Sequence, residues 1–268
     1  MNTEKPKELL ERPNKRKHID TLTCTQKKNK KSKELWNNDL IDTISSHTIN
    51  DIIKPYDYQT KAAQLFINFN RGILSMPCGT GKTITSYLIS NSYKQIIIIS
   101  PLKEFAKQNL DKYIEYGLTS NTLLVDSDGG RDLKQIKKFI KSNQTFLISS
   151  TFCSVDVIFK SLKYMNNSLI IIDEFHNLSK NNVTNEDDDF YKLLNSNQRI
   201  LFMSATHRVY DMENEDYNDE IFGPIIYNMT FTEAIEKKYI TDYQIWLPSI
   251  NENNDEIIND LTIFWVYL

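Results

Sequence analysis

The sequence is poor in cysteine and has no long apolar run. Its three cysteines, Cys24, Cys78 and Cys153, are scattered and form no C-x-x-C pair, so neither a disulfide framework nor a zinc site is indicated. No apolar stretch approaches the roughly 18 residues that a membrane span needs, and the N-terminus is charged rather than signal-like. These absences predict an intracellular protein, in the cytoplasm or the nucleus, with no membrane partner.

Charge is unevenly distributed along the chain. Its 268 residues carry a net charge of −3, and 40% of them are hydrophobic, an ordinary share for a globular protein. Residues 1–33 hold eleven Lys or Arg against four acids, a net +7, so the remainder is near −10. We expect residues 1–50 to be a basic, disordered extension. It would bind phosphates, act as a nuclear localisation signal, or be a solvated tail without a specific partner.

The string MPCGTGKT at residues 76–83 is typical of a phosphate-binding loop, although Met76 stands where the strict pattern has Gly. Gly79 and Gly81 allow the backbone to curl around an anion without obstructing side chains. Lys82 supplies a charge for the β and γ phosphates, and Thr83 a hydroxyl for a metal ion, at the start of a helix whose dipole favours anions. The expected nucleotide-binding residues of the loop are Pro77, Cys78, Gly79, Thr80, Gly81, Lys82 and Thr83.

A second string, IIIDEFH at residues 170–176, ends an apolar run with two acids. Such a run suits a strand buried on both faces of a parallel sheet, and ligands bind at the carboxyl ends of such strands. We expect Asp173 to hold Mg²⁺ together with Thr83, largely through water, and Glu174 to orient or deprotonate the attacking water. The predicted catalytic residues are Lys82, Asp173 and Glu174.

Apolar and amphipathic segments alternate from Tyr56 onward, which predicts an α/β fold with a mostly parallel sheet covered by helices on both faces. The segments 181–189 and 211–220 are polar and acidic, and are expected to be loops. A helix is expected near residues 57–70, and strands near 72–76, 96–100, 122–125, 145–149, 169–172 and 199–203.

These strings, in this order, resemble the first motor lobe of superfamily 2 helicases, with DEFH as a variant of the DEAD and DEAH boxes. The resemblance covers roughly residues 51–248 and implies a RecA-like phosphate-loop NTPase domain that uses ATP and Mg²⁺. Residues 249–268 would then be a tail or the start of a second lobe. By resemblance, Gln59 reads adenine, and His176, Ser204 and Thr206 couple hydrolysis to movement.

Two further strings resemble family segments that contact nucleic acid. The resemblance of IIIISPLKEFAKQ assigns Ser100, Pro101 and Gln108 to the surface along which the nucleic-acid strand runs, which we call the strand track. The resemblance of FLISSTF assigns Thr151 to the same track. The stretch EIFGPIIYNMTFTEAIEKKYITDY resembles the end of this lobe in restriction-type translocases, with His207 in the place of a usual Pro. That likeness favours DNA over RNA as the partner.

Nothing after Tyr243 resembles the family's late motif Q-x-x-G-R-x-x-R, whose arginines complete the ATP site. The sequence therefore predicts half of a helicase or translocase motor, which needs a second lobe, in the same chain or in trans, for full activity. Two alternatives stay open at this point: a non-catalytic half that binds nucleic acid in response to ATP, and a fragment of an enzyme that translocates on duplex without unwinding it.

Deleting residues 1–33 should weaken nucleic-acid binding and flatten its salt dependence. Each neutralised phosphate adds roughly −0.9 to the slope of log affinity against log salt on duplex DNA. Fluorescence anisotropy titrations of the full and shortened chains at several salt concentrations measure this slope. An unchanged slope would leave the extension as a localisation signal or an inert tail.

Overall fold

The computed structural model describes residues 54–128, 130–206 and 219–243. Within these residues a seven-stranded sheet has the order β3-β4-β2-β5-β6-β1-β7, and every strand pair is parallel. The expected RecA-like α/β fold is therefore present. The strands are β1 (Arg71–Ser75), β2 (Gln95–Ser100), β3 (Asn121–Val125), β4 (Phe146–Thr151), β5 (Leu169–Asp173), β6 (Arg199–Ser204) and β7 (Ile225–Asn228).

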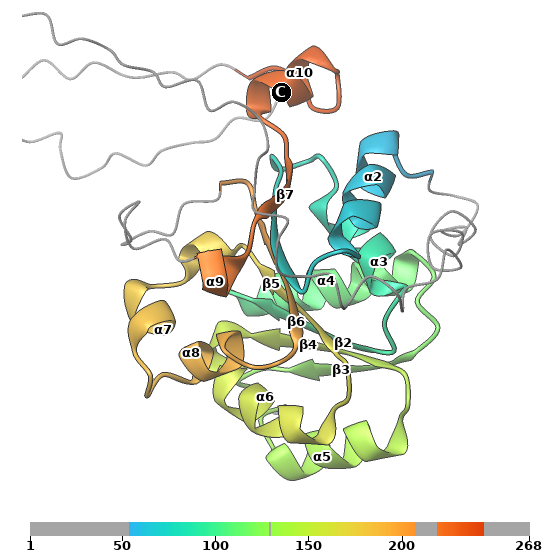
Figure 1. Ribbon diagram of the computed structural model, residues 1–268. Coiled ribbons are helices and arrows are strands. Elements are labelled where there is room, and N and C mark those ends of the chain that lie inside the picture. The colour runs from blue at the N-terminus through green and yellow to red at the C-terminus, as the bar shows by residue number, and fades with distance from the viewer. Residues whose placement is uncertain (1–53, 129, 207–218, 244–268) are drawn as a thin grey trace, which may run out of the picture. The chain divides into compact units, whose positions relative to one another are not determined.

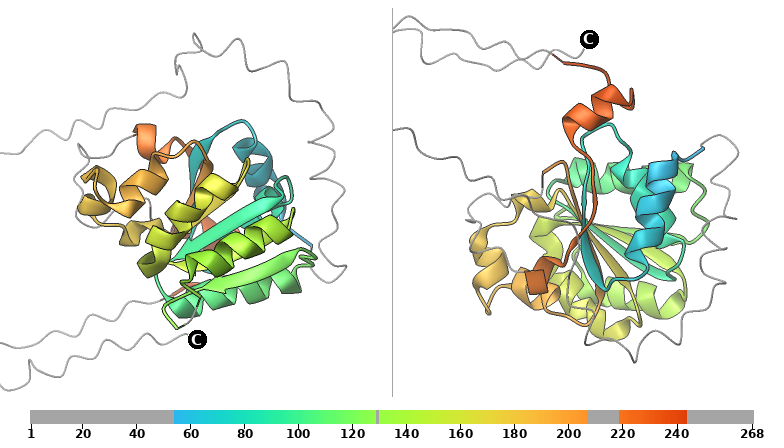
Figure 2. Two further views of the ribbon diagram at one scale, coloured as in Figure 1. Left: turned by 90° about the horizontal axis from the view of Figure 1, so that it is seen from below. Right: turned by 45° about the horizontal axis from the view of Figure 1, so that its top comes forward.

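Helices cover both faces of this sheet (Figures 1 and 2). The first layer packs residues of α2 (Asp57–Phe66), α3 (Lys82–Ser90) and α4 (Lys103–Glu115) against one face. The second layer packs the following helices against the other: α5 (Leu133–Ser142), α6 (Val155–Ser161), α7 (Lys180–Thr184), α8 (Asp189–Leu194) and α9 (Asp219–Phe222). Short 3₁₀ turns are η1 (Phe152–Ser154), η2 (Leu162–Tyr164) and η3 (Phe175–Asn177), and α10 (Phe231–Glu236) follows β7.

Strand β5 shows why this sequence makes a sheet buried on both sides. Its apolar residues alternate between the two cores: Ile170 and Ile172 pack in the second layer, whereas Leu169 and Ile171 pack in the first. Successive side chains of a strand point to opposite faces, so a continuous apolar run is needed where helices cover both. All five residues of β5 are buried.

The expected strands are all present, with bounds shifted by one or two residues, but three expectations need correction. The helix expected at 57–70 ends at Phe66. Strand β7 was not expected; it is a short edge strand that begins one residue after Pro224, whose carbonyl accepts a hydrogen bond from the Ile73 amide at 3.0 Å.

The segment 181–189 is not simply a loop, since it contains most of α7 and the first residue of α8. Ser179 caps α7, and the Asp188 carboxylate accepts the Phe190 amide at 2.7 Å at the start of α8. The same polar residues that suggested a loop are thus helix caps, which satisfy amides at helix starts. The extensions 1–50 and 249–268, and nearly all of 211–220, lie outside the described residues.

Phe222→Ala should destabilise the lobe by about 3–5 kcal/mol. Its fully buried ring packs 5.1 Å from the Phe202 ring centroid and 5.6 Å from that of Phe175, joining α9 to β6 and η3. Urea denaturation measures the loss. The matched control is Ile225→Ala, at a side chain that is 44% exposed, which should cost about 1 kcal/mol or less. Equal losses in both variants would contradict this packing.

Candidate nucleotide site

The predicted site residues meet at the carboxyl edge of the sheet. Strands β5, β6 and β1 are neighbours and run in parallel, so the residues that follow them lie at one edge. This places the phosphate loop after β1 beside Asp173 at the end of β5. Strand β6 also contributes to this edge. The backbone amide of Met76, in the loop after β1, donates to the carbonyl of Ser204 at the end of β6, at 2.9 Å.

The phosphate loop depends on its two glycines. Gly79 and Gly81 both have φ of +82°, a conformation that favours Gly. A Cβ at Gly81 would lie 2.3 Å from Nε2 of Gln59, so a side chain there would displace the group that holds the loop. Thr80 closes the turn by donating its hydroxyl to the Pro77 carbonyl at 2.7 Å. Cys78, in the same turn, is an exposed free thiol.

Lys82 begins α3 and lies at the centre of the site. Its Nζ donates to the Met76 carbonyl at 3.3 Å and lies 3.4 Å from Oε1 of Glu174. Only 10% of the Lys82 side chain and 21% of the Glu174 side chain are exposed. The cation and the carboxylate are therefore paired in a partly buried position, which strengthens their interaction relative to a surface pair.

Asp173 is buried, and a neutral amide holds it. Nδ2 of Asn109 donates to Oδ2 of Asp173 at 2.8 Å and to the Ser100 hydroxyl at 3.1 Å. Burial raises the pKa of the Asp173 carboxyl above its ordinary range, and the bond from Asn109 lowers it in part. A carboxylate desolvated in this way gains from a nearby cation, so the position suits a metal ion.

Glu174 carries backbone strain. Its φ of 47° and ψ of 48° place a residue other than Gly in the left-handed region, which costs about 1–3 kcal/mol and persists only where the surroundings enforce it. Here both carboxylate oxygens are engaged: Oε1 by Lys82, and Oε2 by Nδ1 of His176 at 3.3 Å. The strained backbone thus presents the carboxylate between two nitrogen groups.

The three residues expected to couple hydrolysis to movement lie together. Nδ1 of His176 lies 2.7 Å from the Ser204 hydroxyl, and that hydroxyl accepts the Thr206 amide at 3.1 Å. Because the same His176 nitrogen also approaches Glu174, a chain of contacts runs from Lys82 to Thr206. This arrangement agrees with the coupling role expected by resemblance, which itself stays a prediction.

Gln59, which the resemblance assigns to adenine, bonds to the backbone through both ends of its amide, and its adenine role stays a prediction. It is 2% exposed, its Oε1 accepts the Tyr56 amide at 2.9 Å, and its Nε2 donates to the Thr80 carbonyl at 3.0 Å. Tyr58 donates its hydroxyl to that same carbonyl at 2.6 Å, and burial raises the pKa of Tyr58 to about 12. Both side chains therefore fix the phosphate loop.

Two aromatic residues beside the loop were not predicted from the sequence. Tyr56 is 54% exposed and stacks on Tyr58, with ring centroids 5.6 Å apart. Tyr239, after α10, packs 4.5 Å from Tyr58 and 5.1 Å from Tyr56. The exposed ring of Tyr56 offers an aromatic face next to the loop. No periodic signal marks Tyr239, because it joins the site only through the tertiary fold.

The residues assigned to nucleic acid fall into two groups. Ser100 and Thr151 are buried, and their hydroxyls bond to Asn109 and Ser154, respectively. In this conformation neither side chain is exposed to a nucleic-acid strand at the protein surface. Gln108 is exposed and Pro101 partly exposed, and both remain available for such contact. Asn109 was not predicted from the sequence. It shares the buried face of α4 with Ala106 and Tyr113, and this helical spacing from two apolar residues could have identified it as buried.

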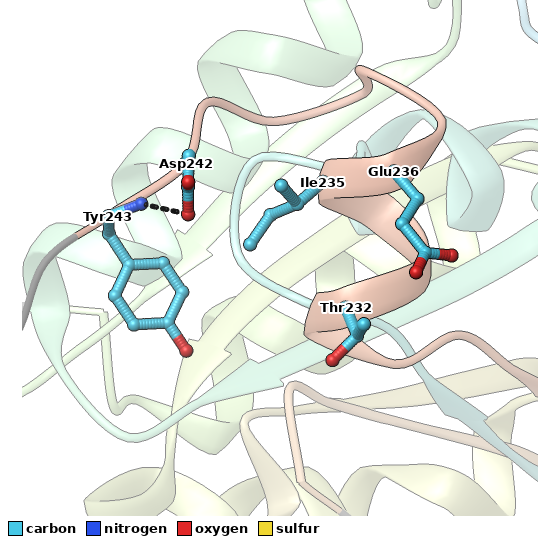
Figure 3. Close-up of a pocket in the computed structure, with 5 residues that line it drawn as sticks. All are labelled: Thr232, Ile235, Glu236, Asp242 and Tyr243. Carbon is cyan, nitrogen blue, oxygen red and sulfur yellow. Dashed lines mark hydrogen bonds between the residues drawn. The ribbon is translucent and has the colours of Figure 1, made fainter.

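A hollow of about 490 Å³ lies elsewhere, beside α10 (Figure 3). The Asp242 carboxylate in its wall accepts the Tyr243 amide at 2.8 Å. It contains none of the predicted site residues. Its lining residues are Thr232, Ile235, Glu236, Asp242 and Tyr243.

The phosphate loop, the acidic strand end and the Ser204 contacts on one parallel sheet define a RecA-like NTPase lobe. The family model "DEAD/DEAH box helicase" matches residues 56–214, more than half of the chain. The chain belongs to this family of helicases.

Relatives agree with that assignment. The chain is 30% identical over 208 residues to "Probable helicase A859L" of African swine fever virus, a match that covers 70% of this chain and 23% of the viral protein. It is 26% identical over 223 residues to "DNA 3'-5' translocase XPB2" of Sulfurisphaera tokodaii, covering 81% of this chain and 45% of that protein. The chain thus spans about a quarter of the length of the viral relative.

Solved structures share the fold. The UvsW helicase from bacteriophage T4 superposes with a TM-score of 0.53 at 22% identity, over 72% of this chain and 67% of that one. The Type ISP restriction-modification enzyme LlaBIII, solved bound to DNA, superposes with a TM-score of 0.56 at 21% identity, over 72% of this chain and 16% of that one. Among the residues that the structure describes, no helix is long and apolar enough to cross a membrane.

Asp173→Asn should stabilise the protein at pH 7 in the absence of nucleotide and Mg²⁺. Because folding raises the pKa of Asp173, the folded state holds this proton more tightly than the unfolded state. The parent therefore loses stability as pH rises above the ordinary aspartate pKa of about 3.9. Asparagine keeps an acceptor for Asn109 but does not titrate.

The gain of Asp173→Asn should therefore grow from about pH 4 toward neutrality. Urea denaturation at several pH values measures it, with Asp111→Asn, at an exposed position of α4, as the matched control. The same pH trend in both variants would contradict burial of Asp173 as the cause.

Proposed function

We propose that this lobe binds ATP with Mg²⁺ and that hydrolysis of the nucleotide drives movement along nucleic acid. One observation carries the proposal: Lys82, Asp173 and Glu174 converge beside a phosphate loop whose glycines hold the required conformation. A structural ion pair alone would need neither a left-handed glycine loop nor a strained Glu174.

The donors present fit Mg²⁺ only with help from a nucleotide. Among the described residues, no group of three or more His, Cys, Asp or Glu side chains could hold a metal ion. Asp173 and the Thr83 hydroxyl would hold Mg²⁺ together with phosphate oxygens and water, because this ion keeps much of its hydration shell and seldom has an all-protein cage. Bound there, the ion would neutralise charge on the phosphates.

The protein's own groups suggest how they divide the work. Lys82 would exchange Glu174 for the β and γ phosphates, since a phosphate chain carries more charge than one carboxylate. Glu174, so released, would accept a proton from the attacking water. His176 contacts both Glu174 and Ser204, so a change at Glu174 would reach the residues that follow β6.

The partner of this motor would be nucleic acid, with DNA favoured. The names of two matched proteins support DNA: one is a DNA 3'-5' translocase, and the other is a restriction-modification enzyme bound to DNA. Gln108 and Pro101 would face the strand. A second lobe, in the same polypeptide or supplied in trans, would add arginines to the γ phosphate. Contact with nucleic acid favours the cytoplasm or the nucleus as the location of the protein.

Movement along duplex without unwinding is a second candidate, because one relative is named a translocase. A strand-displacement assay and a duplex-stimulated ATPase assay on the protein joined to its second lobe separate the two. Stimulation by duplex without displaced strand would favour translocation, and displaced strand would favour a helicase.

Lys82→Ala should weaken ATP binding about 10- to 100-fold, because a hydrogen bond to a charged group contributes roughly 1.5–3 kcal/mol. Titration with a fluorescent ATP analogue measures the affinity. Lys94→Ala, at an exposed position before β2, is the control and should bind as the parent does. Undiminished affinity of Lys82→Ala would refute the phosphate-loop assignment.

Glu174→Gln should keep ATP binding but lower the hydrolysis rate by about 10²–10⁴, because the amide keeps the shape but cannot accept the proton of water. Single-turnover hydrolysis with the second lobe present measures the rate. Glu233→Gln, in the exposed pair with Lys237 on α10, is the control. Hydrolysis at the parental rate would show that Glu174 is not the base.

A further inference from the structure

A strongly basic surface lies on the second helix layer, away from the nucleotide site. Residues 131–164 hold seven Lys or Arg against two acids, a net +5 in a chain whose total is −3. Helix α5 packs against α6 and η2, and Figure 1 draws α5 and α6 together below the sheet. We call this surface the basic face; its lysines are Lys134, Lys137, Lys138, Lys141, Lys160 and Lys163.

The periodicity of α5 creates this face. Ile136 and Ile140 are buried against the sheet, and Lys134, Lys138 and Lys141 are exposed on the outside. The first and last of these lysines are seven positions apart, or about 10 Å along the helix axis. Among the described residues none of the three is paired with an acid. Like charges at i,i+3 and i,i+4 destabilise a helix, so the protein's own stability does not explain their number.

Contacts across the elements bring the other cations to the same surface. Nζ of Lys137 on α5 and of Lys163 on η2 lie 5.0 and 5.2 Å from the centroid of the Tyr164 ring. Arg131 and Lys160 approach Asp156 at 2.8 and 3.8 Å. One carboxylate thus serves two cations, and within the described part of the chain the other lysines of the face have no acidic partner.

The chemistry of the face fits a phosphate backbone. Proteins that bind single strands add aromatic platforms on which bases stack. Here two ammonium groups already cover the ring of Tyr164. The face therefore offers point charges rather than a stacking platform, which suits contact with the backbone of a duplex irrespective of its sequence.

The basic face is separate from the residues assigned to the strand track. Gln108 lies on α4, in the first helix layer, whereas α5 belongs to the second. Helix α5 ends next to the beginning of β3, where the Asn121 side chain donates to Asn143 at 2.7 Å. The end of α5 that carries Lys141 therefore lies where the parallel strands begin, whereas the phosphate loop lies where they end.

We propose that the basic face binds the phosphate backbone of double-stranded DNA and holds a duplex beside the lobe, outside the strand track. This inference rests on the proposed function, since it gives the motor a second contact with its substrate. Such a contact would keep the protein on DNA during those stages of the ATP cycle in which the strand track binds nucleic acid weakly.

The test compares Lys138→Gln/Lys141→Gln with Lys61→Gln/Lys94→Gln in the full chain. All four lysines are exposed, and both variants lose two positive charges, so the basic N-terminal extension and the net charge are matched. The probe is a fluorescein-labelled DNA duplex of about 20 base pairs, titrated without nucleotide at several salt concentrations. The slope of log affinity against log salt is negative, and two lost phosphate contacts should make it less negative by about 1.8 in the first variant only.

Equal slopes and affinities in the two variants would overturn the proposal. Competition adds a second criterion: poly-glutamate that displaces the labelled duplex from the parent protein better than unlabelled duplex does at equal charge would indicate an acidic protein partner and would also overturn the proposal. Thermal unfolding of both variants checks that they fold. In the parent protein, bound duplex should protect Lys138 and Lys141 from chemical acetylation.

Failure of the proposed function gives a different result. A parent that does not bind a fluorescent ATP analogue would refute the motor, whatever the duplex slopes are. ATP binding that is lost in Lys82→Ala, combined with unchanged slopes in the Lys138→Gln/Lys141→Gln variant, would refute the basic face alone.

Discussion

The ion pair between Lys82 and Glu174 joins the two halves of the candidate site, and the parallel register of the sheet makes it possible. Strands β1 and β5 both pair with β6 in parallel, so the loop after β1 and the acids at the end of β5 reach one edge. With either strand reversed, the lysine and the carboxylate would lie at opposite edges. The chemistry proposed for the lobe therefore depends first on strand direction.

Around that ion pair, the protein holds charge in a partly desolvated place. Asp173 is buried, with a neutral amide from Asn109 as its donor, and Glu174 has a strained backbone. Burial of Asp173 is unfavourable in the protein alone, as its raised pKa indicates, and so is the left-handed backbone of Glu174. A bound cation and phosphate chain would relieve both, which is the usual reason for strain and shifted pKa values to gather at functional sites. The basic face differs, because its charges are exposed and its selectivity would come from their number.

Much of the fold was predictable because the strands are continuous apolar runs, as in β2 and β5, and because a glycine loop between a strand and a helix is typical of phosphate binding. Strand β7 was missed, since four residues after a Gly-Pro pair carry little pattern. Helices α7 and α8 were missed because a helix of five or six residues has too few turns for a period, and its polar caps look like loop residues. Asn109 was missed although Ala106 and Tyr113 mark its buried face.

The sequence by itself determined the order of the elements, the phosphate loop and the acidic pair, because each is local: a period of two or of 3.6 residues, or a glycine that the turn requires. Only the tertiary structure decided that Gln59 bonds to the phosphate loop, that Ser100 is buried, and that lysines of α5 and η2 lie over one tyrosine ring. Those facts depend on which segments pack together across dozens of residues. Packing sets burial and hydrogen-bond partners, and no local pattern encodes them.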